Sequence, residues 1–150
     1  MSAYSRNTLQ TAYARFWFQN VDHAARRRLW LKLAKLIGNG VQILQAVESI
    51  RDRRIASGGK DDPETYALDA WSAAMKNGSR LSRAMDGWVT VEEMMLISAG
   101  EQSGTLESAL RSAARVMEAR KRISSAVYAG LAYPFVLMLM AIGVLFLFGF

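Results

Sequence analysis

Residues 100–110 read GEQSGTLESAL, in which two glycines bracket three residues and an amphipathic run follows at once. After the second glycine, Leu106 and Leu110 are spaced as on one face of a helix. Glycines between two segments of helical periodicity predict a turn between packed helices. We expect Gly100 to end one helix, Gly104 to allow a tight entry into the next, and Ser103 to cap that next helix.

The rest of the chain has the same helical character, because Ala, Leu, Met, Arg and Glu dominate and strand-like alternation is scarce. Helices are predicted over residues 22–37, 41–56, 62–76, 80–85, 91–99 and from 105 onward. Asp22 and Asp62 are good N-cap residues, and Pro63 suits the first position of a helix. The predicted fold is all-α, an antiparallel bundle of about six helices whose last helix continues into a transmembrane segment.

Residues 123–150 carry no charged side chain and exceed the ~20 apolar residues that cross a bilayer. Tyr133 is expected near the first interface, and Pro134 is tolerated in membrane helices. The basic residues 120–122 lie just before this segment, so the positive-inside rule predicts a cytoplasmic N-terminal side. The predicted organisation is an N-terminal arm (1–21), a cytoplasmic helical bundle (22–122) and a transmembrane segment (123–150) of a longer chain.

The formal net charge of +6 is concentrated in short arginine-rich clusters at residues 26–28, 51–54 and 120–122. These clusters are short for a nucleic-acid footprint, and we expect no nucleic-acid partner. A cluster such as Arg51, Arg53 and Arg54 is usually a solvated face, with contact to an acidic protein partner as the alternative. The absence of cysteine excludes disulfides and thiolate metal sites.

Catalytic motifs do not fit this chain. The Gly-x-x-Ser-Gly order around Ser103 differs from the G-x-S-x-G nucleophile elbow, and the single histidine, His23, is distant in sequence. Gly59 and Lys60 lack the hydroxyl residue that completes a phosphate-binding loop. We therefore expect no enzymatic activity and no organic cofactor. Glu101 and Glu107 leave open a divalent cation such as calcium. The alternatives are a structural role at the helix junction for Glu101 and a stabilising position at a helix N-terminus for Glu107.

Three segments carry a family resemblance: NGSRLSRAM (77–85), ISAGEQSGTL (97–106) and AYP (132–134). They resemble the F domain of the inner-membrane platform proteins of type II secretion and type IV pilus systems. That pattern is roughly G-x-x-L-x-x-A-L, an apolar helix, G-E-x-S-G-x-L, a further helix, and Y-P before the first membrane span. The matching motif residues are Gly100, Glu101, Ser103, Gly104, Leu106, Tyr133 and Pro134. Departures are the missing proline after Val41 and the pair Trp88-Val89 where many members have Phe-Pro.

The resemblance implies a non-enzymatic scaffold in the bacterial inner membrane, with its N-terminal domain in the cytoplasm. Its implied partners are a cytoplasmic assembly ATPase, other inner-membrane assembly proteins, pilin or pseudopilin subunits and membrane lipid. A homodimer of the helical domain is compatible with the sequence, and the choice between pilus and secretion stays open. The alternative is an unrelated membrane-anchored helical adaptor or sensor domain. The aromatic stretch at residues 13–18 is expected to pack on the bundle, with a place at the membrane interface as the other option.

Overall fold

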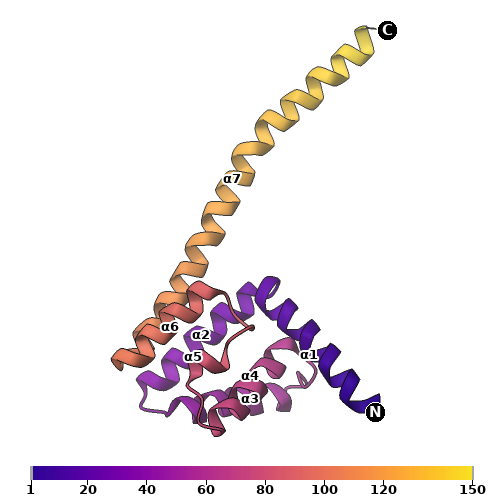
Figure 1. Ribbon diagram of the computed structural model, residues 1–150. Helices are drawn as coiled ribbons and strands as arrows, with labels where there is room; N and C mark the ends of the chain where they lie inside the picture. The colour runs from indigo at the N-terminus through magenta and orange to yellow at the C-terminus, as the bar shows by residue number, and fades with distance from the viewer. Residues whose placement is uncertain (1, 150) are drawn as a thin grey trace. The chain divides into compact units, whose positions relative to one another are not determined.

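The computed structural model describes the backbone of residues 2–149 and the side chains of residues 9–120, 130 and 132–149. All regular elements in these residues are helices, which confirms the all-α prediction. Figure 1 shows them in chain order: α1 (Ser2–Asn20), α2 (His23–Gly38), α3 (Ile43–Ala56), α4 (Pro63–Lys76), α5 (Leu81–Ala84), α6 (Val91–Ser103) and α7 (Leu106–Phe148). The helix that the sequence did not predict is α1.

Local signals in the sequence explain where several helices begin. The Asp22 carboxylate accepts a hydrogen bond from the Ala25 amide at 3.2 Å, as an N-cap does for the exposed amides of a first turn. Thr90 caps α6 in the same way by accepting from the Glu93 amide at 3.4 Å. Pro63 is the first residue of α4, where its missing N–H costs nothing. These starts agree with the sequence prediction to within a residue or two.

The residues up to Arg115 form one compact unit with an aromatic core. The rings of Trp30 and Trp71 stack, with centroids 5.8 Å apart and planes 11° from parallel. Phe18 packs edge-on against Trp71 and against Trp88, with centroid distances of 5.9 and 6.5 Å. Aliphatic side chains from α2, α3, α4, α6 and α7 complete the buried core, among them Leu29, Leu33, Val47, Leu68, Ile97 and Leu110. Each fully buried side chain of this size contributes about 1.5–3 kcal/mol, so apolar burial is the main stabilising term.

The residues from Val116 onward form a second unit, in which α7 continues to Phe148 with Pro134 inside the helix. The large apolar side chains described there, such as Tyr133 and Leu147, are exposed. Among the described residues, none of the helices combines the length and the hydropathy that a membrane crossing requires. The predicted span over residues 123–150 includes side chains outside the described set, so it stays a prediction, as do the domain boundaries at residues 21 and 122.

Candidate functional site

The GEQSGTL motif of residues 100–106 forms a junction of helices in the structure, at Glu101 on α6. The Glu101 carboxylate reaches the start of α5, where Oε1 accepts from the Leu81 amide at 2.8 Å and Oε2 from the Ser82 amide at 3.2 Å. The Ser82 hydroxyl adds a third hydrogen bond to Oε2 at 2.7 Å. The first amides of a helix have no intrahelical partner, and a negative charge is favoured beside them. Because Arg80 provides no side-chain cap, Glu101 caps α5 from a distant part of the sequence.

Gly100, one residue earlier, lets α6 and α7 approach closely. A Cβ atom at Gly100 would lie 2.2 Å from the Cβ atom of Ala109 and 3.2 Å from the Thr105 carbonyl oxygen. No side chain fits into that space without separating the two helices. Gly100 lies inside α6, so the prediction that it ends this helix is wrong.

Gly104 is the residue that ends α6, in the left-handed conformation with φ of +72°. The Thr105 amide then bonds the Gly100 carbonyl at 2.8 Å, which closes the turn. The predicted capping role of Ser103 is also wrong, because Ser103 is the last residue of α6. Its hydroxyl donates to the Ala99 carbonyl at 2.8 Å within that helix. Leu106 is half-buried at the first position of α7, as its place in the motif suggests.

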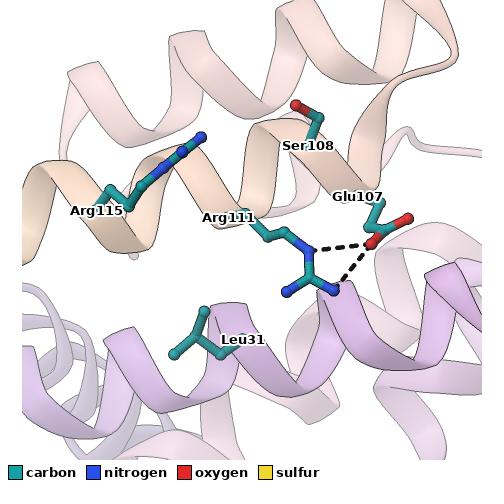
Figure 2. A pocket seen from close by; sticks show the side chains of 5 residues that line it. All are labelled: Leu31, Glu107, Ser108, Arg111 and Arg115. Atoms are coloured by element: carbon teal, nitrogen blue, oxygen red, sulfur yellow. Dashed lines mark hydrogen bonds and ion pairs between the residues drawn. The ribbon is translucent and has the colours of Figure 1, made fainter.

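The two glutamates that the sequence offers as cation ligands both have protein partners. Glu107, in the first turn of α7, binds Arg111 through Oε1, at 3.0 Å to Nε and 2.9 Å to Nη2 (Figure 2). A cation at Glu101 would have to displace its amide and hydroxyl donors. In the described part of the chain, no three His, Asp or Glu side chains gather as a metal site requires. The cation site at Glu101 and Glu107 stays a prediction that this geometry does not favour.

A hollow of about 390 Å³ beside Glu107 is lined by residues of α2 and α7 (Figure 2). Its lining consists of Leu31, Glu107, Ser108, Arg111 and Arg115. The Arg111 guanidinium is bound to Glu107, and Arg115 donates to the Ser112 hydroxyl at 3.0 Å. Ser108 has no histidine or cysteine among these neighbours, and the carboxylate is held by an arginine. The hollow therefore lacks the paired base that activates a serine nucleophile.

The arginine cluster of α3, predicted as a partner contact, is largely used inside the domain. Arg51 pairs with Asp69 of α4 at 3.3 Å, and Arg54 pairs with Glu64 of α4 at 2.7 Å. These contacts hold α3 against α4, which lie side by side in Figure 1. Arg53 is exposed and has no ion-pair partner among the described residues. Of the three side chains, Arg53 is the one that is free to meet another protein.

Two carboxyl groups along the α3–α4 contact have shifted pKa values. Burial raises the pKa of Glu64, and the nearby Arg54 guanidinium only partly opposes this. The hydrogen bond from the Lys76 ammonium, at 2.5 Å, lowers the pKa of the half-buried Glu48 carboxyl. Glu48 also accepts from the Ser72 hydroxyl at 3.1 Å. The shift at Glu64 therefore comes from burial, whereas the shift at Glu48 comes from its contact with Lys76.

Sequence reasoning missed a buried ion pair between α2 and α6. Arg26, which belongs to the arginine-rich cluster at residues 26–28, is only 1% exposed, and Glu93 is only 4% exposed. Arg26 Nε lies 2.9 Å from Glu93 Oε2, and Nη2 donates to Glu93 Oε1 at 3.1 Å. Arg26 Nη1 donates to the carbonyls of Phe18 and Gln19, at the end of α1. The missed signal was spacing, since Arg26 precedes the buried Leu29 by three residues and so lies on the apolar side of α2.

Comparison with known proteins places this arrangement in a family. The family model described as type II secretion system (T2SS), protein F, matches residues 31–150. The type 4 fimbrial assembly protein PilC of Pseudomonas putida is 30% identical over 116 residues, which are 75% of this chain and 28% of that protein. The chain thus spans less than a third of that relative's length. The matched residues include α3 to α7 and the Glu101 junction, and the resemblance drawn from the motifs is confirmed: this chain belongs to the type II secretion system protein F family.

Proposed function

We propose that this chain is a scaffold domain of an inner-membrane platform protein for type IV pilus biogenesis or type II secretion. The observation that carries the proposal is the Glu101 junction, in which the family motif caps α5 and packs α6 against α7. The motif residues serve helix packing, and among the described residues no activated nucleophile or nucleotide loop accompanies them. A non-enzymatic role follows, in which an assembly ATPase supplies the work in trans.

The proposed location is the bacterial inner membrane, with the helical bundle in the cytoplasm. Support comes from the sequence, because residues 123–150 are uncharged and long enough for a span. The positive charges of Arg111, Arg115 and Arg120 precede that segment on α7. An excess of Lys and Arg on one flank is typical of the cytoplasmic side.

The proposed partners are the cytoplasmic assembly ATPase, other inner-membrane assembly proteins and pilin or pseudopilin subunits. A contact through the arginine cluster of α3 would depend on Arg53, because Arg51 and Arg54 already bind acidic residues of α4. An exposed arginine suits an acidic surface on the partner. A homodimer of the bundle is a further possibility within this proposal.

The test uses the full-length gene in its host. Deleting the gene should abolish pili or secretion, and the tagged protein in detergent should capture the assembly ATPase. Arg53→Glu should weaken that capture about tenfold, a free-energy change of about 1.4 kcal/mol. Lys60→Glu is the matched control, because it makes the same charge change on an exposed loop residue and should leave capture unchanged. Capture of no assembly component by the wild-type protein, with pili and secretion intact after deletion, would overturn the proposal.

A further inference from the structure

The inner face of α1 is firmly docked on the bundle. Phe18 is fully buried and Ala14 is 2% exposed, one helical turn apart on the same side of α1. Phe18 lies between the rings of Trp71 and Trp88, and the Arg15 guanidinium lies 5.1 Å from the centroid of the Trp88 ring. These contacts, together with the hydrogen bonds from Arg26 to the end of the helix, fix how α1 is rotated about its axis.

The opposite side of α1 carries a second apolar stripe, which faces away from the core. Leu9, Tyr13, Phe16 and Trp17 follow the spacing of one helix face and are 70%, 61%, 61% and 39% exposed. The rings of Tyr13 and Trp17 stack on each other, with centroids 5.8 Å apart. Because the inner face is fixed, these four side chains, here called the outer stripe, cannot turn into the core. A contiguous exposed apolar patch of this kind is typical of a binding surface.

The chemistry of α1 favours a lipid surface as what covers the outer stripe. Residues 1–21 contain Arg6 and Arg15 but no aspartate or glutamate, the first acidic residue being Asp22. Tyrosine and tryptophan rings favour the headgroup level of a bilayer, where one end of the ring is wet and the other apolar. The absence of acidic side chains from residues 1–21 also avoids repulsion from the negative surface of anionic lipid. Helices that lie in the plane of the membrane interface present Trp, Phe and Leu side chains to the lipid, as the outer stripe does.

We propose that α1 is an interfacial helix: its inner face holds the bundle, and its outer stripe lies in the headgroup region of an anionic bilayer. The proposal rests on the membrane location proposed above, and it adds a second point of attachment besides the predicted span. This contact would limit how the bundle tilts against the membrane surface. The proposed contact assigns a function to the aromatic residues of α1, which the family pattern leaves unexplained.

The distribution of tryptophan makes the test selective. Trp30 and Trp71 are fully buried, Trp88 is 1% exposed and Trp17 is 39% exposed. The segment 123–150 contains no tryptophan. In vesicles of phosphatidylglycerol and phosphatidylethanolamine brominated near the headgroup, the full chain should lose emission chiefly from Trp17. Trp17→Phe should remove at least half of the quenching, while Trp30, Trp71 and Trp88 still fluoresce.

A second variant tests binding without removing the reporter. Leu9→Ser combined with Phe16→Ser should lower the quenching of Trp17 at least twofold, because both changes lie on the outer stripe and leave the docked face intact. Vesicles without phosphatidylglycerol should also quench less. Equal quenching of the wild type and Trp17→Phe would overturn the proposal. Dimerisation through α1 with Trp17 protected from the brominated lipid would overturn it as well, and would assign the outer stripe to a second copy of the chain.

Resistance to carbonate extraction, measured on the same vesicles, separates this inference from the proposed span. A chain that resists extraction but shows no quenching of Trp17 retains its span and refutes the interfacial helix. A chain that is extracted but shows Trp17 quenching refutes the span and supports the interfacial helix. A chain that is extracted and shows no quenching of Trp17 refutes both the span and the interfacial helix.

Discussion

Replacing Arg26 by methionine tests what the buried ion pair contributes to the stability of the bundle. Methionine keeps much of the length of the side chain but removes the charge. Glu93 would then be a buried carboxylate without its cation, and the carbonyls of Phe18 and Gln19 would lose their donor. Removing one partner of a buried pair costs about 3–5 kcal/mol. That is a large part of the roughly 5–15 kcal/mol that stabilises a domain, so the variant should be close to unfolding.

The double variant Arg26→Met with Glu93→Leu separates the two contributions of Arg26. Removing both charges also removes the cost of burying them, and such replacements are often neutral or stabilising. The two carbonyls at the end of α1 would still lack a donor, however, and a hydrogen bond to a charged group contributes about 1.5–3 kcal/mol. We therefore expect the double variant to be more stable than Arg26→Met and less stable than the wild type.

Tryptophan emission during urea unfolding is the assay, with the full chain in detergent. All four tryptophans lie in the unit that ends at Arg115, so emission reports on the bundle alone. With a typical urea slope of about 1–3 kcal/mol per molar, the Arg26→Met midpoint should fall by about 2 M. Lys60→Met at an exposed position is the control and should shift the midpoint by less than about 0.3 M. A similarly small shift for Arg26→Met, or a double variant less stable than the single one, would refute the reasoning.

Three further changes test the junction and the α3–α4 contact with the same urea assay. Gly100→Ala should destabilise the bundle by about 1–3 kcal/mol, because the new methyl group would overlap Ala109. A loss of stability below about 0.5 kcal/mol would contradict the close packing of α6 and α7. Glu101→Gln should lower the stability of the bundle by about 1–2 kcal/mol, because the glutamine side chain accepts through one oxygen only and its amide group would face donors at the start of α5. As the control, Gln102→Ala at the neighbouring exposed position should leave stability nearly unchanged. Glu64→Gln should gain stability over the wild type as pH rises. Since burial raises the pKa of folded Glu64 above its ordinary value of 4.5, the stability of the wild type is complete below 4.5 and falls as pH rises through the folded value. Midpoints at about pH 4 and about pH 7 check this, and a difference between variant and wild type that does not change with pH would contradict it.

The sequence predicts best what depends on neighbouring residues. The start of α2 follows from a side chain at Asp22 that bonds an amide three residues later, and the start of α4 follows from the fixed φ of Pro63. The break between α6 and α7 was predicted for the same reason. The separate roles of the two glycines were not predicted, because composition shows that a turn exists but not which residue adopts a positive φ. Gly104 does so, and Gly100 is instead required by a helix that packs on it.

Features that depend on distant residues were not predictable in this way. From the sequence, Arg26 is only one of three consecutive arginines, and its partner Glu93 is on another helix. The cap that Glu101 provides joins two helices in the same manner, so the sequence left open whether its carboxylate is structural or binds a cation. In α1 two apolar stripes lie on opposite sides of the helix. Together they leave no clear polar face, so the sequence shows no amphipathic periodicity there. Only the docking of Phe18 separates the inner stripe from the outer one.

One turn of α6 connects three helices, and this explains why the family motif is compact in sequence. Glu101 binds the start of α5, and the adjacent Gly100 receives the first turns of α7. A displacement of α7 would therefore change its contact with Gly100, and it would alter the position of the adjacent Glu101, which caps α5. Glu101→Gln and Gly100→Ala should accordingly be non-additive in a double-mutant cycle, and strictly additive losses would show that the two contacts work independently.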